Sequence, residues 1–226
     1  MAKLILFDVD KTLLVDSKDI SEYVAESLRN IYGMVVSVNL NDYEGDTSQN
    51  IAEAVLRAAG MEEKEIKSRL NRYMEDVFYT YYNVAGHDKL KVHDGSAELL
   101  SDLEKRGMLI GIATGEGERI VKFKVEKAGL DKLFKIGGYG NNGKEMKDII
   151  GFAINKAAEE HEFEKQSIFV VGSSPYAIKA AKELGLYAIA IADGKYSVDD
   201  LKAANPDVVV KSPKDKGKII SFVESH

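Results

Sequence analysis

The chain has 226 residues, 45% of them hydrophobic and 30% charged, which is typical of a globular protein that buries a sizeable core. Its formal net charge of -6 argues against a nucleic-acid backbone as the main partner and leaves small ligands, held in a confined site, as better candidates. The absence of cysteine excludes disulfides, thiolate metal sites and a cysteine nucleophile.

We expect a cytoplasmic protein without a membrane partner. The residues that precede Asp8 are too few to form a signal peptide. No apolar run approaches the roughly 20 residues that a membrane-spanning helix needs.

The first predicted element is a strand over residues 3–7, whose continuous apolar run is typical of a strand buried on both faces. The next block, residues 16–86, is predicted to be helical throughout, apart from an ambiguous apolar segment at 34–38. Its helices are expected over residues 17–32, 46–59 and 62–83.

Beyond residue 86 the pattern changes to a regular alternation of strands and helices. Strands are predicted at residues 108–113, 133–136, 167–171, 187–192 and 207–210, and helices at 96–106, 116–128, 145–160, 175–184, 198–203 and the C-terminus. This alternation predicts a Rossmann-like α/β core, a parallel sheet with helices on both faces. We therefore expect a core of residues 1–15 and 87–226, with residues 16–86 inserted as an all-helical domain.

Two carboxylates, Asp8 and Asp10, directly follow the first predicted strand. Ligands of open parallel sheets bind beyond the carboxyl ends of the strands. Two neighbouring carboxylates repel each other, and a hard cation such as magnesium would relieve that repulsion. The alternative is an acidic turn that caps the following segment.

The segment from Phe7 to Leu14, FDVDKTLL, resembles the first motif of the haloacid dehalogenase superfamily, Asp-x-Asp-x-Thr after an apolar strand. The resemblance implies that Asp8 attacks phosphorus to form an aspartyl-phosphate and also binds magnesium. It implies that the side chain of Asp10 is the general acid toward the leaving alcohol and then the base toward water, and that the backbone carbonyl of Asp10 helps to hold the metal. Such a covalent route divides one difficult displacement into two easier ones.

A second motif lies at residues 109–115, LIGIATG, where an apolar strand ends in a hydroxyl and a glycine just before a helix. A helix N-terminus beside a hydroxyl is suited to phosphate binding. The resemblance assigns phosphoryl binding to Thr114, with Gly115 as a further substrate contact. An ordinary N-cap threonine is the alternative.

The family's third motif is a lysine that neutralises charge around the phosphoryl group and the nucleophile. The resemblance points to Lys144, with Lys147 as the second candidate at the start of the same predicted helix. A solvated surface lysine is the alternative for either position.

The fourth motif departs from the family pattern. Residues 168–181 resemble its Gly-Asp-x-x-x-Asp segment, but Ser173 and Ala177 stand where the two acids are expected. A hydroxyl is a poorer magnesium ligand than a carboxylate, so we expect a metal site of Asp8, Asp10 and Ser173 with lowered affinity. Asp193 is a possible replacement ligand, although an ordinary loop aspartate explains it better.

Within the helical block, the segment from Tyr43 to Thr47 resembles the cap of the phosphoglycolate-phosphatase-like branch. In that branch a helical cap closes over the core and contacts the leaving group of the substrate. The resemblance therefore makes Asp46 and Thr47 candidate substrate contacts, which helix capping explains equally well.

Taken together, the residues favour a magnesium-dependent phosphomonoester hydrolase with an atypical metal site. Its expected partner is a small phosphorylated metabolite rather than nucleic acid, and its expected state is a monomer or homodimer. One alternative is a catalytically impaired relative that binds a phosphorylated ligand or a protein. Another is a 2-haloacid dehalogenase, which Asp10 and Thr12 disfavour because they match the phosphatase form of the first motif.

Overall fold

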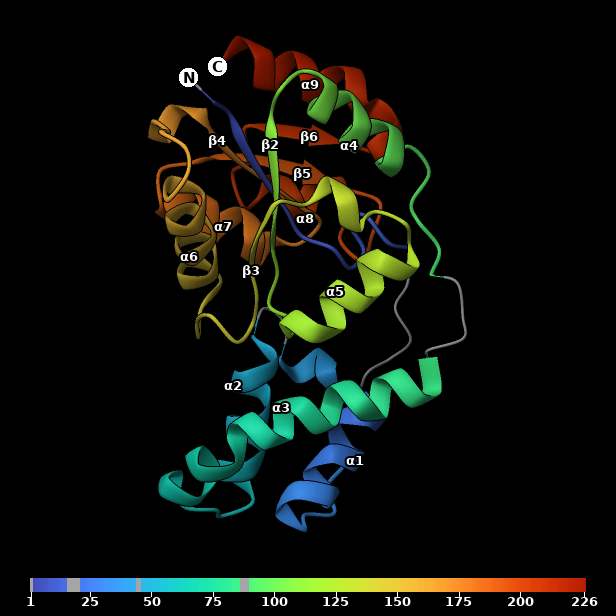
Figure 1. The fold of residues 1–226 in the computed structure, drawn as a ribbon, viewed down its shortest axis with the longest axis vertical. Coiled ribbons are helices and arrows are strands. Elements are labelled where there is room, and N and C mark those ends of the chain that lie inside the picture. The colour runs from blue at the N-terminus through green and yellow to red at the C-terminus, as the bar shows by residue number, and fades with distance from the viewer. Residues whose placement is uncertain (1, 16–20, 44–45, 86–89) are drawn as a thin grey trace.

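The computed structural model describes residues 2–15, 21–43, 46–85 and 90–226. Figure 1 shows a sheet with helices on both sides and, at the other end of the molecule, three helices that stand apart from the sheet. None of the helices in the described part of the chain is long and apolar enough to cross a membrane.

The sheet has six strands, all parallel, in the order β3-β2-β1-β4-β5-β6. They are β1 (Leu4–Phe7), β2 (Leu109–Ala113), β3 (Ile136–Gly138), β4 (Ile168–Gly172), β5 (Tyr187–Ile191) and β6 (Val208–Val210). The strand that comes first in the chain therefore lies at the centre, hydrogen-bonded to β2 on one side and to β4 on the other.

Alternate residues of β1 face opposite sides of the sheet, and each side is buried by its own helices. Ile5 and Phe7 belong to a core cluster with side chains of α4, α5 and α9. Leu4 and Leu6 belong to a second cluster with side chains of α6, α7 and α8. These helices are α4 (Ser96–Lys105), α5 (Glu118–Lys127), α6 (Met146–Ala158), α7 (Pro175–Glu183), α8 (Val198–Lys202) and α9 (Lys216–Ser225). The predicted α/β fold class is confirmed.

A third hydrophobic cluster holds the three helices that stand apart from the sheet, α1 (Ser21–Tyr32), α2 (Ser48–Ala58) and α3 (Glu63–Ala85). Two side chains of the core helix α5, Ile120 and Phe123, also belong to this cluster. The helical part is therefore docked on the core through α5. The start of the first predicted helix, residues 17–20, and the predicted domain boundaries near residues 16 and 86 lie outside the described residues.

The predicted element ends agree with the structure within two residues wherever they are described, apart from one strand. The strand predicted at residues 133–136 is wrong, because residues 131–133 form a turn of 3-10 helix and β3 begins at Ile136. Glycine is a poor strand former, so the residue pattern favours the apolar residues before Gly137 as the strand. Here Gly137 leaves room for the ring of Tyr139, whose hydroxyl lies 2.1 Å from the place a Cβ would occupy. The ambiguous segment 34–38 has no regular structure.

We predict that Gly140→Ala destabilises the protein by about 2 kcal/mol, because close backbone packing at this position leaves no room for a side chain. An added Cβ would lie 2.0 Å from the carbonyl oxygen of Gly115, in the loop after β2. Gly151→Ala is the matched control, because nothing lies within 4 Å of its Cβ position inside helix α6. It should stabilise by about 0.5 kcal/mol through helix propensity. Urea unfolding measures both, and equal effects would contradict the packing argument.

Candidate active site

Asp8 lies at the carboxyl end of the central strand. Its backbone N–H still donates to the carbonyl of Val171 on β4, at 2.9 Å, so the backbone is fixed by the sheet up to this residue. The carboxylate accepts a hydrogen bond from the N–H of Val9 at 2.9 Å and another from the side chain of Thr114 after β2. Because β1 is bonded to β2 and β4, the residues that follow these three strands meet at one edge of the sheet.

The surroundings of Asp8 disfavour its ionised form. Burial raises the pKa of its carboxyl from 3.8 to about 6, and the nearby charge of Asp10 adds to the increase. The hydrogen bond from Thr114 opposes this increase, as do the N–H of Val9 and the charge of Lys124. Ionising Asp8 therefore costs free energy in the folded protein, and a cation bound beside the carboxylate would lower that cost.

Asp10 is paired with a buried lysine. The ammonium of Lys124 lies 2.7 Å from Oδ2 of Asp10, and 2.8 and 2.7 Å from the two carboxylate oxygens of Glu116. Lys124 has no exposed surface, and Glu116 is 8% exposed. The other carboxylate oxygen of Asp10, Oδ1, is buried and has no hydrogen-bond partner among the described residues.

The electrostatics of this cluster follow from its burial. Burial lowers the pKa of Lys124, but Asp10 and Glu116 outweigh that effect and hold the pKa above its usual range. Burial and the neighbouring Asp10 raise the pKa of Glu116, while Lys124 opposes the increase. Two carboxylates, those of Asp10 and Glu116, thus share one internal cation at the edge of the sheet.

Sequence reasoning missed both Lys124 and Glu116. A signal existed, because Lys124 stands three and four residues after Val121 and Ile120, two buried residues of helix α5. Residues at this spacing share one face of a helix, so Lys124 occupies a core position. A lysine is almost never fully buried unless it is paired.

The second motif contacts the helical part directly. The carbonyl of Gly115 accepts a hydrogen bond from the N–H of Ser48, the first residue of α2, at 3.0 Å. The carbonyl oxygen of Asp46 lies 3.2 Å from the place where a Cβ of Gly115 would be. Asp46 is exposed, and the buried Thr47 caps α2 by accepting from the N–H of Asn50 at 3.2 Å. Asp46 and Thr47, the two candidate substrate contacts, thus lie beside the second motif.

Lys144 points to the helical part in this structure. Its ammonium lies 3.0 Å from Oε2 of Glu53, a buried residue of α2 that is 91 positions away in the chain. The backbone carbonyl of Lys144 also accepts a hydrogen bond from the side chain of Asn50. Among the described residues, no hydrogen bond or ion pair joins Lys144 to Asp8. Lys147 pairs with Glu145 at 2.7 Å.

The fourth-motif positions lie where the resemblance expects them, but with neutral side chains. Ser173 is buried and its hydroxyl accepts a hydrogen bond from Thr12 at 3.0 Å. Ala177 is buried in the first turn of α7. Asp193 lies 3.1 Å from the side chain of His93, which accounts for its position without a metal.

A magnesium ion, which the resemblance implies, fits the donors that are present. The charge of Asp10 raises the cost of ionising Asp8, which a cation beside the Asp8 carboxylate would offset. Hard oxygen donors of this kind suit magnesium, which commonly keeps several waters. The described residues contain no group of three His, Cys, Asp or Glu side chains that could hold a metal. The protein would therefore supply only a few of the ligands of the magnesium ion.

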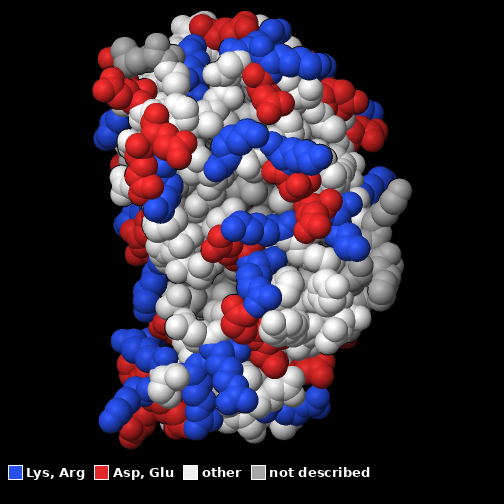
Figure 2. Space-filling view, viewed as in Figure 1, with Lys and Arg blue, Asp and Glu red and all other residues white. Residues whose placement is uncertain are grey.

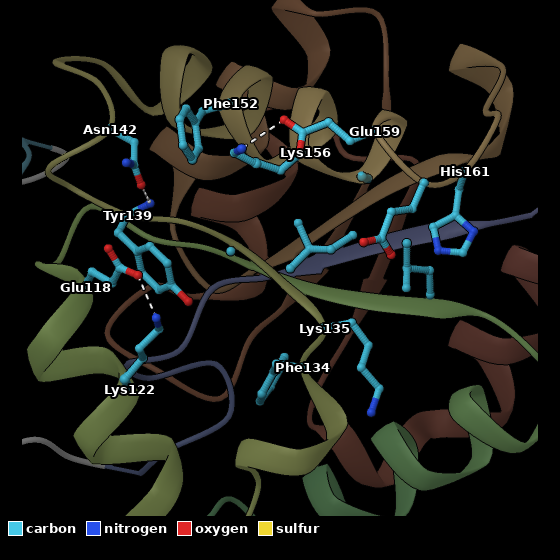
Figure 3. Close-up of a pocket in the computed structure, with 15 residues that line it drawn as sticks. Glu118, Lys122, Phe134, Lys135, Tyr139, Asn142, Phe152, Lys156, Glu159 and His161 are labelled. Carbon is cyan, nitrogen blue, oxygen red and sulfur yellow. Dashed lines mark hydrogen bonds and ion pairs between the residues drawn. The ribbon is translucent and has the colours of Figure 1, made fainter.

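A cavity of about 550 Å³ runs beside the edge strand β3, and none of the candidate site residues described above lines it. Four of its lining side chains form two ion pairs, Lys122 with Glu118 and Lys156 with Glu159, as Figure 3 shows. On the face drawn in Figure 2, basic and acidic side chains of the described residues are interspersed, without a broad basic area.

Comparison with known proteins gives consistent relatives. Residues 5–191 match the family described as haloacid dehalogenase-like hydrolase. The phosphoglycolate phosphatase of Vibrio cholerae is 25% identical over 210 residues, 92% of either chain. That of Synechococcus elongatus is 24% identical over 214 residues, 93% of either chain.

Solved structures share the fold over nearly the whole chain. CbbY from Rhodobacter sphaeroides, in complex with phosphate, has a TM-score of 0.75 at 18% identity and covers 96% of this chain and 97% of its own. A hydrolase from Pseudomonas syringae has a TM-score of 0.72 at 18% identity, covering 98% and 99%. At such identities the likeness shows the fold.

We predict that Asp8→Asn makes the metal-free protein more stable at neutral pH. The folded pKa of about 6 lies above the ordinary 3.8, so stability is lost as the pH rises from about 4 to beyond 6. At pH 8 the variant should gain about 2–3 kcal/mol in free energy of unfolding, and roughly half of that at pH 5. Urea unfolding in chelator at both values measures this.

Asp199→Asn is the control for that measurement, because Asp199 is 94% exposed and should change stability by less than about 0.5 kcal/mol. An Asp8→Asn variant that is no more stable than the wild type at pH 8 would contradict the assigned cost of ionisation.

Proposed function

Because the chain belongs to the haloacid dehalogenase-like hydrolase family, we propose that it is a phosphatase that hydrolyses phosphomonoesters through a phosphorylated Asp8. The observation that carries this proposal is the arrangement of Asp8, which accepts a hydrogen bond from Thr114 and has Asp10 as its charged neighbour. A nucleophile, a phosphate-binding hydroxyl and a second carboxyl group are thus combined at one edge of the sheet. The phosphoglycolate phosphatases among its relatives support the same reaction class.

The reaction takes two steps. In the first, a carboxylate oxygen of Asp8 bonds to phosphorus, the ester P–O bond breaks, and Asp10 gives its proton to the leaving oxygen. In the second, Asp10 takes a proton from a water molecule whose oxygen attacks phosphorus. The bond from phosphorus to Asp8 then breaks, which releases inorganic phosphate and restores the free carboxylate.

Thr114 and Gly115 would hold the phosphoryl oxygens, since both precede helix α5 at the carboxyl end of β2. Lys144 is the proposed third-motif lysine. To serve there it must exchange its contact with Glu53 for the phosphate, a dianion that competes for the same ammonium.

Asp8, Asp10 and Ser173 would hold a magnesium ion. When bound, the ion neutralises charge on the transferring group and fixes its orientation. Ser173 supplies only a neutral hydroxyl that is already bonded to Thr12, so the protein contributes fewer charges than the family pattern expects.

Residues 16–86 would act as the cap of this enzyme, inserted into a core of residues 1–15 and 87–226. Asp46 and Thr47 would contact the leaving group, because they lie at the start of α2 beside Gly115. A site enclosed in this way suits a small phosphorylated metabolite. We propose cytoplasmic location, no nucleic-acid or membrane partner, and a monomer or homodimer.

A second candidate is a binding protein with little turnover. It is favoured by the neutral side chains of Ser173 and Ala177 and by the pairing of Asp10 with Lys124. It differs from the enzyme in a simple way, because phosphate binding would then survive chelation of metal while no phosphate is released.

The decisive experiment measures phosphate release from p-nitrophenyl phosphate and from a panel of small phosphate esters that includes 2-phosphoglycolate, with magnesium and with chelator. We expect magnesium-dependent turnover in the wild type and a loss of at least about a thousandfold in Asp8→Asn. Lys144→Met should lose about a hundredfold, whereas the control Lys147→Met should keep most activity.

Activity that survives in Asp8→Asn would overturn the covalent route. Equal losses in the two lysine variants would remove the special role of Lys144. Phosphate binding without release, in the presence of chelator, would establish the binding protein instead.

We further predict that Ser173→Asp lowers the magnesium concentration for half-maximal activity by about tenfold, because a carboxylate replaces a neutral ligand. Ser174→Asp is the matched control, since it adds the same charge one residue away, where the side chain caps α7. Titration of activity with magnesium chloride measures both. An equal effect in the two variants would indicate general charge attraction rather than ligation.

A further inference from the structure

Lys124 is the most deeply buried charge near the site. It reaches the site from helix α5, and its ammonium contacts three carboxylate oxygens, one from Asp10 and two from Glu116. An ammonium has three N–H donors, so these acceptors use its full capacity. The ring of Tyr81, from α3 of the helical part, lies 5.5 Å from the ammonium and covers it.

The two carboxylate oxygens of Asp10 have different surroundings. Oδ2 is held by Lys124 at 2.7 Å, whereas Oδ1 is buried without a partner in the described chain. A charge-assisted hydrogen bond at this distance restricts rotation of the carboxyl group. The side chain of Asp10 as a whole is 26% exposed, so Lys124 orients a residue that is only partly enclosed.

Stability does not account for such a cluster. Buried ion pairs generally recover their desolvation cost only in part, and apolar side chains of similar volume often serve the fold as well or better. Lys124 occupies a helix position whose neighbours Val121 and Val125 are apolar and buried. The charges are located where the helix meets Asp10, which points to a role in the site.

We propose that Lys124 and Glu116 form a positioning pair that fixes the side chain of Asp10 for proton transfer to the leaving group. Both carboxylate oxygens of Glu116 hold the ammonium of Lys124 in place. The ammonium in turn fixes Oδ2 of Asp10 through its hydrogen bond. This inference rests on the proposed function, because it assigns Asp10 the acid role. Neither residue of the pair touches the transferring group.

The test uses the double variant Glu116→Leu/Lys124→Met, which removes both charges together. Lys124→Met alone would leave two buried carboxylates unpaired and could simply fail to fold. Two substrates are compared, p-nitrophenyl phosphate, whose leaving group needs little protonation, and 2-phosphoglycolate, whose alkoxide leaving group needs a proton.

We expect the folded double variant to lose about a hundredfold or more in kcat/KM on 2-phosphoglycolate and less than about tenfold in kcat/KM on p-nitrophenyl phosphate. The comparison uses kcat/KM because it reports the first step, in which the leaving group departs, whereas kcat also includes the hydrolysis step that both substrates share. A purely structural role would lower both kcat/KM values together. Lys122→Met is the matched control on the same helix, since Lys122 pairs with Glu118 at the surface, and both rates should stay at wild-type values.

A folded double variant whose kcat/KM values are unchanged, or fall equally on both substrates, would overturn the positioning role. A wild-type chain that releases phosphate from neither substrate would overturn the proposed function, and this inference with it. If the double variant does not fold, circular dichroism will show it. The conservative variant Lys124→Arg then decides, because a displaced cation should still reduce the alkyl substrate's rate more than the aryl substrate's.

Discussion

The site depends on one constraint, the burial of β1 on both faces at the centre of the sheet. Because its neighbours are β2 and β4, the chain leaves β1 at the point where the strand order reverses, and connections on either side run in opposite directions. Asp8 therefore emerges between Thr114 and Ser173 without any special local conformation. An apolar strand of four residues places Asp8, the proposed nucleophile, and the helices that cover the strand on both faces make that place rigid.

The same constraint concentrates negative charge. Asp8, Asp10 and Glu116 lie at one edge of the sheet, and burial makes Asp8 and Glu116 costly to ionise unless a cation is near. Two kinds of interaction compensate this negative charge. Lys124 offsets Asp10 and Glu116 from inside, whereas the charge of Asp8 is met mainly by hydrogen bonds from Val9 and Thr114. The carboxylate with the least internal compensation is thus the proposed nucleophile.

The sequence predicted the parts of this arrangement that depend on local pattern. Continuous apolar runs located the strands, and their alternation with helices indicated a parallel sheet covered by helices on both faces. The edge strand β3 was misplaced because its glycines are accommodated by a tertiary contact with Tyr139. The pairing of Lys144 with Glu53, across 91 positions, joins side chains from separate elements, and no periodicity reports such a partner. The buried position of Lys124 could be read from its helix face, but its carboxylate partners could not.

These charges bear on how a ligand would complete the site. With Asp10 paired to Lys124 and a neutral hydroxyl at Ser173, a magnesium ion alone would find few protein oxygens, and a phosphate dianion alone would face the charge of Asp8. Bound together, each relieves the other, since phosphate oxygens are magnesium ligands and the ion neutralises the phosphate. The proposed release of Lys144 from Glu53 follows the same logic. One carboxylate holds the Lys144 ammonium, and the phosphate dianion offers that ammonium a stronger partner.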